Sequence, residues 1–214
     1  MEEKINQAIK DALENAPERK FVESVDISFT IKDVDLKNPN NRIQEEIRLP
    51  AGRGRAPSIA MFADGEMAAK AKDAGIVVID PTKIEELGGT RQKARNLAKK
   101  HDFFLSEIPH LGPIGRFLGV VLGPRGKMPR PVPPVADPGA IAAGLKDVAI
   151  VRSRDKITFH TVVGTRDQGA EALTENGMEV WKRVTGKLER GSGNIRSFYV
   201  KTSMGPAIRV EVIL

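Results

Sequence analysis

The sequence has no cysteine among its 214 residues. This absence excludes disulfides, thiolate zinc sites and cysteine nucleophiles. No apolar run reaches the length that crosses a bilayer. The first residues include Glu2, Glu3 and Asp11, where a signal peptide needs a basic flank and an apolar stretch. We therefore expect a cytoplasmic protein that contacts no membrane.

Neither common glycine-rich nucleotide motif is complete. A Walker loop needs Ser or Thr after its Gly-Lys pair, but Lys127 is followed by Met128, and Val121 stands where the first glycine belongs. The dinucleotide fingerprint fails as well, because Pro57 and Arg196 occupy the third-glycine positions of the two candidate loops. The sequence predicts no bound nucleotide and no other cofactor.

Catalytic and metal-binding patterns are also missing. His101, His110 and His160 show no metal-ligand spacing, so we interpret them as surface or strand-face histidines and predict no metal site. Glu45 and Glu46 are adjacent on a predicted strand and point to opposite faces, so they cannot share a proton as a catalytic pair. We expect a protein that is not an enzyme.

Composition indicates a globular, basic chain. Apolar residues make up 40% and charged residues 29% of the sequence. The chain has 34 Lys and Arg against 28 Asp and Glu, a net charge of +6. This excess suits a polyanionic partner but does not identify one.

The N-terminal and C-terminal parts of the chain share a pattern of amphipathic helices and long strands. Apolar spacing predicts a helix over 2–16, stopped by Pro17. Strands are predicted over 21–32, 42–50 and 156–163, a helix over 168–185, and a hairpin of 194–202 with 207–214 across "SMGP".

The middle of the chain differs. Short apolar strands are predicted at 58–63, 75–80 and 102–107, with helices at 66–73, 81–100 and 138–145. This alternation is typical of a parallel sheet flanked by helices. We predict an α/β (α+β) fold with two domains. Residues 1–63 and 157–214 form a discontinuous domain with an open mixed sheet and helices, and residues 64–156 form an inserted Rossmann-like domain.

The stretch Leu122 to Pro134, "LGPRGKMPRPVPP", has three basic residues, five prolines and no acid. Because it fails as a nucleotide loop, we interpret it as a rigid extended loop on the inserted domain. Two roles stay open for it, a purely structural loop and a contact with RNA through Arg125, Lys127 and Arg130.

Basic residues also gather beside glycine and aromatic residues. Arg19 and Lys20 precede Phe21, and Arg53 and Arg55 lie in a glycine-rich turn. Such charge beside accessible backbone amides suits phosphate contacts. The alternative is an ordinary solvated rim with Phe21 in the core.

The segment "KTSMGP" at 201–206 is more specific. Thr202 and Ser203 offer hydroxyls, Met204 an adaptable apolar contact, and Gly205 a backbone that permits positive φ and close approach. A plain hairpin turn is the alternative, for which methionine is an unusual residue.

Three segments together resemble one known family. "RKFVES" (19–24), "LGPRGKMPRP" (122–131) and "SFYVKTSMGP" (197–206) have the order and spacing of the ribosomal protein L-one family, over essentially the whole chain. The lysine after "GPRG" and the short "SMGP" turn resemble archaeal members. The resemblance implies a first domain built from both termini and an inserted Rossmann-like domain.

The resemblance also implies function. It implies binding to large-subunit ribosomal RNA at the mobile stalk, assistance to transfer RNA leaving the exit site, and repression of the protein's own messenger RNA. It implies RNA contacts at Lys20, Phe21, Ser24, Asp26, Ser197, Thr202, Ser203, Met204 and Gly205. Arg19, Arg53, Arg55, Arg125 and Lys127 are expected at a salt-sensitive rim, and the free protein is expected to be a monomer.

Two rival functions remain open from the sequence. One is an α/β enzyme that binds a phosphorylated ligand in the inserted domain, and the other is a ribosome-assembly relative of the same fold. Copurified RNA that is lost at high salt favours RNA binding, whereas saturable nucleotide binding with turnover favours the enzyme.

Overall fold

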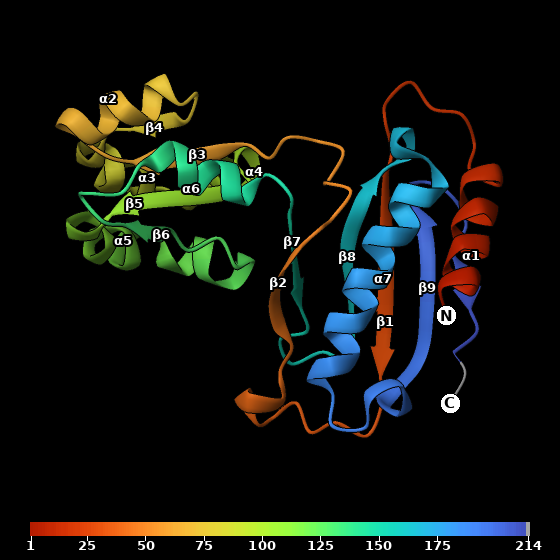
Figure 1. The fold of residues 1–214 in the computed structure, drawn as a ribbon. Helices are drawn as coiled ribbons and strands as arrows, with labels where there is room; N and C mark the ends of the chain where they lie inside the picture. The colour runs from red at the N-terminus through yellow and green to blue at the C-terminus, as the bar shows by residue number, and fades with distance from the viewer. Residues whose placement is uncertain (213–214) are drawn as a thin grey trace. The chain divides into compact units, whose positions relative to one another are not determined.

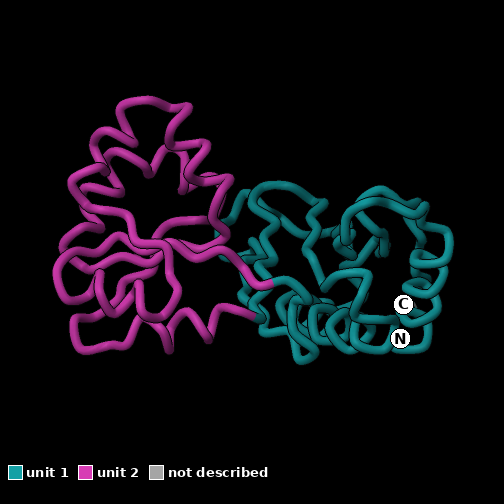
Figure 2. Tube along the Cα trace, turned by 90° about the horizontal axis from the view of Figure 1, so that it is seen from above, with its two compact units in different colours: residues 1–55, 147–214 teal, residues 56–146 magenta. Residues whose placement is uncertain are grey.

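The computed structural model describes residues 1–212. The chain divides into two compact units, Met1–Arg55 with Asp147–Leu214 (unit 1) and Ala56–Lys146 (unit 2), which Figure 2 shows in two colours. Each unit has its own buried apolar core. The predicted α/β class with an inserted second unit is confirmed. No helix within residues 1–212 is long and apolar enough to cross a membrane.

Unit 1 is built on a four-stranded antiparallel sheet in the order β10-β9-β1-β8. Its strands are β1 (Ser24–Ile31), β8 (Thr158–Thr165), β9 (Ile195–Thr202) and β10 (Ile208–Val210). The sequence predicted a mixed sheet, yet every described pairing in this unit is antiparallel. The predicted hairpin of β9 and β10 is present, and the last two residues of its predicted second strand, 213–214, lie outside the described residues.

Two helices cover one face of this sheet, α1 (Glu2–Glu14) and α7 (Gly169–Lys187) (Figure 1). The core beneath them centres on Phe29 in β1, whose ring lies 4.7 Å from that of Phe198 and 5.4 Å from that of Phe159, centroid to centroid. Both helices were predicted from apolar spacing, and burial of that apolar face is what fixes them to the sheet.

The other face of the sheet carries polar side chains. Along β1, buried and partly exposed residues alternate strictly, so Ser24, Asp26, Ser28 and Thr30 point away from the helices. Their antiparallel neighbours on the same face include Lys201, opposite Asp26. The period-two pattern in the sequence predicted this division.

A two-stranded antiparallel ribbon, β2 (Gln44–Arg48) with β7 (Val148–Arg152), completes unit 1. This pairing places β7 in unit 1, although the sequence analysis assigned it to the inserted domain. Likewise β3 (Ile59–Phe62) pairs within unit 2, although it was assigned to the first domain. The division in the structure therefore falls earlier than 63/64 and 156/157 at both crossings.

Unit 2 contains a four-stranded parallel sheet in the order β4-β3-β5-β6, the Rossmann-like pattern predicted from the sequence. Besides β3, the strands are β4 (Val77–Ile79), β5 (Phe103–Glu107) and β6 (Arg130–Val132). The helices are α2 (Gly65–Asp73), α3 (Ile84–Gly89), α4 (Arg91–Lys100), α5 (Leu111–Arg125) and α6 (Pro138–Leu145). Short 3-10 helices lie at Pro81–Lys83 and Ile108–His110 in unit 2. Those of unit 1 are Pro39–Asn41, Arg166–Gln168 and Gly191–Asn194.

The stretch Leu122 to Pro134 is not the extended loop predicted. Its first four residues are the last turn of α5, which ends where Gly126 adopts φ 70° and the amide of Lys127 donates to the carbonyl of Leu122 at 3.0 Å. Part of the remainder forms β6. Pro124 lies in the last turn of α5, and Pro131 lies on the edge strand β6, where a missing amide costs little, whereas Pro129, Pro133 and Pro134 lie outside helix and strand.

Candidate nucleic-acid interface

A buried carboxylate organises the start of β1. Glu23 is only 1% exposed, and its Oε1 accepts a hydrogen bond from the backbone amide of Met204 at 2.8 Å. Its Oε2 lies 3.6 Å from Nη1 of Arg166. A buried charge is stable only when it is paired, so these contacts hold together segments far apart in the sequence.

Arg166 extends this connection to α1. Its guanidinium donates to the carbonyls of Leu13 at 3.3 Å and Pro17 at 3.4 Å, and its own amide donates to the carbonyl of Glu23 at 2.9 Å. The end of α1, the start of β1 and the segment after β8 are therefore joined through one side chain.

The turn between β9 and β10 is tied to β1 by Ser203. Its amide and its hydroxyl both donate to the carbonyl of Ser24, at 3.0 Å and 3.3 Å. Within the turn, the amide of Gly205 donates to Oγ1 of Thr202 at 2.9 Å. Thr202 is 0% exposed, so the predicted direct RNA contact of its hydroxyl does not fit the structure, in which that hydroxyl positions the turn.

Gly205 is required because a side chain at this position would have no room, and not because of its backbone φ angle. It is absent from the residues with positive φ, contrary to the expectation from the sequence. A Cβ at this position would instead collide with Oγ1 of Thr202 and lie 3.3 Å from Cβ of Ala16. Close packing against the end of α1 therefore excludes larger residues here.

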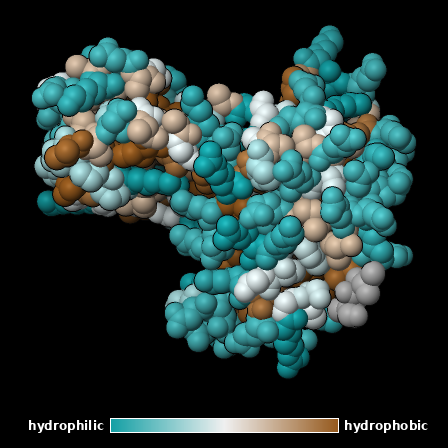
Figure 3. Space-filling model, viewed as in Figure 1, coloured by the Kyte–Doolittle hydropathy of each residue, from teal (hydrophilic) through white to brown (hydrophobic). Residues whose placement is uncertain are grey.

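Large apolar side chains are exposed around this assembly. Phe21 is 56% exposed and Met204 57%, and Val22 is similarly exposed. The alternative that placed Phe21 in the core is therefore wrong. Arg19 and Lys20 precede Phe21 and are exposed as well. Hydrophilic residues dominate the face of the molecule shown in Figure 3. Phe21 and Val22 directly precede Glu23, which is bonded to Met204, so these exposed apolar residues gather around one buried carboxylate.

The polar sheet face continues from this point. Asp26 faces Lys201 across the β1–β9 pairing, and Ser197 lies opposite Thr30 on the same strands. Burial raises the pKa of Asp26, while His160 and Lys201 nearby act to lower it. Asp26 therefore combines a carboxylate with basic neighbours on a surface otherwise rich in hydroxyls.

The glycine-rich turn at 51–55 is held rigidly. Gly52 and Gly54 both adopt φ 74°, which only glycine adopts freely. Asn176, 0% exposed, donates to the carbonyls of Gly52 and Val163, both at 2.8 Å, and accepts from the amide of Ala51 at 3.0 Å. The turn thus presents Arg55, which is exposed, and Arg53, which is partly exposed, from a fixed backbone.

The two predicted rim residues of unit 2 have other roles in the structure. Nζ of Lys127 donates to the carbonyls of Ala98 at 2.9 Å and His101 at 2.7 Å, so it caps the end of α4. Nη1 of Arg125 donates to the carbonyl of Val121 at 3.0 Å, although the side chain is exposed. Lys127 therefore fits a structural role better than the predicted rim contact.

The three histidines differ from one another. His160 is exposed on β8, as predicted, whereas His101 is buried, and its Nδ1 lies 2.8 Å from Oγ of Ser58. Burial lowers the pKa of His101, and the charges of Lys100 and Lys127 add to the effect. His110 lies beside two carboxylates of unit 2 that its sequence spacing gave no reason to connect with it.

Sequence reasoning missed Glu23, Arg166 and Asn176. Glu23 stands inside the quoted "RKFVES", where an acid beside a basic run was a usable signal. Arg166 and Asn176 offered none, because the contacts that tie them to α1 and to the turn at 51–55 span more than a hundred residues of the chain.

A protein-family model matches most of the chain, including the residues described above. The model of the ribosomal protein L1p/L10e family matches residues 12–206, a range that contains both Glu23 and Met204. The chain belongs to this family.

Three of its relatives carry the name "Large ribosomal subunit protein uL1". The Methanothrix thermoacetophila protein is 47% identical over 98% of this chain and 100% of its own length. The Methanothermobacter thermautotrophicus protein is 45% identical over 98% and 100%. The Thermoplasma acidophilum protein is 45% identical over 97% and 95%. The resemblance to archaeal members of the L1p/L10e family is confirmed.

Proposed function

We propose that this protein is a cytoplasmic component of the large ribosomal subunit that binds ribosomal RNA through unit 1. The names of its relatives support the assignment to the large subunit. The binding surface we propose, called here the anchored surface, comprises residues 19–26 and 197–206. The glycine-rich turn at 51–55 forms its basic rim.

The observation that carries this proposal is the pair of exposed apolar side chains on a fixed backbone. Phe21 and Met204 are each more than half exposed, and the amide of Met204 is bonded to the buried Glu23. Single-stranded or unpaired RNA bases stack on aromatic side chains and pack against apolar ones. A backbone already held in place loses little entropy when such contacts form.

Basic side chains around these residues supply the electrostatic part of binding. Arg19, Lys20 and Arg55 are exposed, and Arg53 is partly exposed, within the same unit. Contacts of Lys and Arg with phosphates release counterions, so affinity falls as the salt concentration rises. These residues position the RNA without reading its sequence.

The hydroxyls and the carboxylate of the polar sheet face read the RNA itself. Ser24, Ser197 and Ser203 offer hydroxyls, and Asp26 can accept from a ribose 2′-hydroxyl or a base amino group. A carboxylate facing RNA repels phosphate, so its presence favours shape recognition over charge alone.

Within the ribosome we place the RNA target at the mobile stalk, close to the path of transfer RNA leaving the exit site. We also propose that the same surface binds the protein's own messenger RNA and represses its translation. These roles rest on the family resemblance. They require that ribosomal and messenger RNA compete for one surface.

The first test measures binding to a stalk-derived ribosomal RNA fragment across a salt series. We expect tight binding that weakens by roughly tenfold for Met204→Ala and Ser203→Val. The first removes an apolar contact with the RNA, and the second removes a hydroxyl contact together with the bond from Ser203 to the carbonyl of Ser24, changes worth about 1–3 kcal/mol each. Ile157→Ala is the matched control, since Ile157 is also exposed but pairs with the opposite end of β1.

Two outcomes contradict the proposal. Unchanged affinity of folded Met204→Ala removes this residue from the contact. Binding that ignores both variants, falls steeply with salt and fails to distinguish unrelated RNA reduces the surface to a basic patch. A second RNA arm uses the messenger RNA leader, which must displace the ribosomal fragment.

A further inference from the structure

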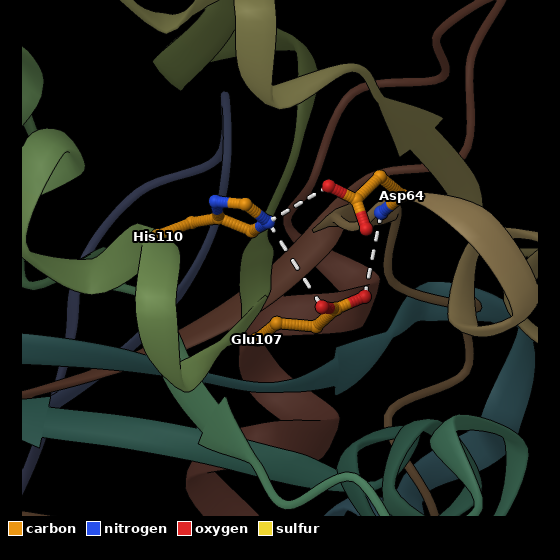
Figure 4. Close-up of side chains that lie close together, drawn as sticks. All are labelled: Asp64, Glu107 and His110. Carbon is orange, nitrogen blue, oxygen red and sulfur yellow. Dashed lines mark hydrogen bonds and ion pairs between the residues drawn. The ribbon is translucent and has the colours of Figure 1, made fainter.

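Three potential metal ligands meet at one edge of the parallel sheet in unit 2. Asp64 follows β3, Glu107 ends β5 and His110 ends the 3-10 helix before α5, and one ligand atom of each lies within 4.8 Å of the others (Figure 4). This edge belongs to neither the anchored surface nor its rim.

The imidazole of His110 points between the two carboxylates without a hydrogen bond. Its Nε2 is 3.5 Å from Oδ2 of Asp64 and 3.9 Å from Oε2 of Glu107. This nitrogen is buried and has no hydrogen-bond partner among the described residues. Buried polar atoms are seldom left unsatisfied, so this nitrogen can take a further partner such as a water or a metal ion.

Asp64 gives up a stabilising bond in order to face His110. It stands at the N-cap of α2, yet its side chain makes no capping hydrogen bond. The corresponding aspartates Asp80 and Asp137 do cap their helices, with Asp80 accepting from the amide of Thr82 at 2.9 Å and Asp137 from that of Gly139 at 2.9 Å. The carboxylate of Asp64 is therefore not used as a helix cap and faces His110 instead.

Glu107 is oriented by the backbone beside it. Its Oε1 accepts from the amide of Asp64 at 3.3 Å, which leaves Oε2 on the side of His110. Such a bond fixes a ligating carboxylate in the way that outer partners do in metal sites.

The position in the fold is one where ligands bind. In the strand order β4-β3-β5-β6, the chain runs outward in opposite directions from β3 and β5. The cluster lies at the carboxyl ends of these two strands. In open parallel sheets, this reversal of strand order leaves a crevice that binds ligands.

We propose that Asp64, Glu107 and His110 bind a divalent transition-metal ion, with Zn²⁺ as the best match. Carboxylate oxygens and an imidazole nitrogen are zinc ligands, and bonds of about 2.0–2.2 Å in a tetrahedron place ligand atoms roughly 3.4 Å apart. The separation of 3.5 Å between Asp64 and His110 already fits this spacing. The two carboxylates balance the charge of the ion.

The surroundings leave room for a fourth ligand. Asp64 and Glu107, though not His110, line a pocket of about 230 Å³, together with Gly65, Glu66, Met67, Lys70 and Pro134. The ammonium of Lys70 lies 2.7 Å from Glu66, so a carboxylate already offsets its charge. Three protein ligands with an open pocket leave one position for water. The ion ties the loop after β3 to the end of β5.

The test is titration of tag-free, chelator-treated full-length protein with Zn²⁺ by calorimetry. We expect one ion per chain, with affinity lowered at least about 100-fold by His110→Ala and by Glu107→Gln. The matched control His160→Ala removes an exposed histidine of unit 1 and must bind like the wild type. Co²⁺ gives a second readout, because a chain without cysteine has no thiolate bands to obscure its visible spectrum.

Each outcome decides the proposal. Absence of stoichiometric binding, equal affinity in wild type and His110→Ala, or Mg²⁺ binding as tight as Zn²⁺ overturns it. Circular dichroism of each variant confirms that a loss of binding is not a loss of fold. No RNA is present, so the outcome is independent of the function proposed above.

Discussion

Asp26 shows how a single residue on the polar sheet face links stability to pH. Burial raises its pKa above the ordinary value of 3.8, despite the opposing effects of His160 and Lys201. Between the two values the folded state binds more protons than the unfolded state, so stability falls as the pH rises through this window. Ionised Asp26 therefore lowers the free energy of unfolding at neutral pH.

Asp26→Asn removes this cost. At about pH 7, we expect the variant to have a higher free energy of unfolding than wild type. This gain in stability should be smaller at about pH 3, where both side chains are neutral. Urea unfolding of both proteins at the two pH values measures the difference. A difference that does not change with pH would falsify the assignment of a raised pKa.

Gly205 tests the close approach between the β9–β10 turn and α1. Gly205→Ala places a methyl group against Oγ1 of Thr202, which must move or displace the turn. We expect weaker RNA binding and a loss of roughly 1–3 kcal/mol in stability. Gly186→Ala is the control, because its Cβ meets no atom within 4 Å and alanine favours the helix. Equal effects of the two substitutions would remove the steric argument.

Among the elements, the glycine-rich turn at 51–55 depends most on one distant helix residue. Asn176→Ala removes the side-chain partner of the Ala51 amide and the Val163 carbonyl, and it leaves the Gly52 carbonyl with Gln168 alone at 3.2 Å. We expect a loss of roughly 3 kcal/mol or more in urea unfolding. The slope of RNA affinity against salt should also become shallower, because Arg53 and Arg55 are no longer held in place.

The control for this element is Asn96→Ala, which removes an exposed asparagine whose side chain accepts one bond from Gln92. It should change stability by less than about 0.5 kcal/mol. A similarly small effect of Asn176→Ala would show that the turn at 51–55 keeps its conformation without the Asn176 side chain.

Elements with clear periodicity could be predicted from the sequence, and those held by distant contacts could not. The alternation along β1 and the apolar spacing of α1 each specify a structure locally. Helix α5 was missed because four glycines and two prolines lower its intrinsic preference. Burial of Ile114, Leu118 and Leu122 outweighs that preference, and their helical spacing was the signal that could have revealed it.

The candidate site divides in the same way. Exposed residues such as Phe21 and Met204 could be named from the sequence because they stand in recognisable segments. The partners that hold them could not be named, because Glu23 and Arg166 meet only after the sheet has formed. The candidate metal ligands at 64, 107 and 110 meet for a similar reason, at the common edge of a parallel sheet.

For the whole molecule, the two separate cores predict two separate unfolding events. Phe104 is buried in the core of unit 2 and Phe29 in that of unit 1. Phe104→Ala should destabilise unit 2 by about 3–5 kcal/mol and leave unit 1 folded and able to bind RNA. Phe29→Ala, the matched substitution, should abolish RNA binding.

The single tryptophan makes this prediction measurable. Trp181 lies in the core of unit 1, so its fluorescence reports on that unit, whereas circular dichroism reports on both. In Phe104→Ala, we expect the fluorescence transition in urea to stay in place while an earlier phase appears in circular dichroism. A joint shift of both signals would mean that the molecule unfolds as one cooperative body.

The pairing of β1 with β9 has a consequence for the protein during its own synthesis. Residues 56–146 emerge from the ribosome as one uninterrupted segment and can fold while translation continues. Glu23, in contrast, waits for its partner Met204, which is made 181 residues later. A nascent chain therefore has no anchored surface until Met204 has been made. The repression proposed above would therefore require a chain that has been synthesised past Met204.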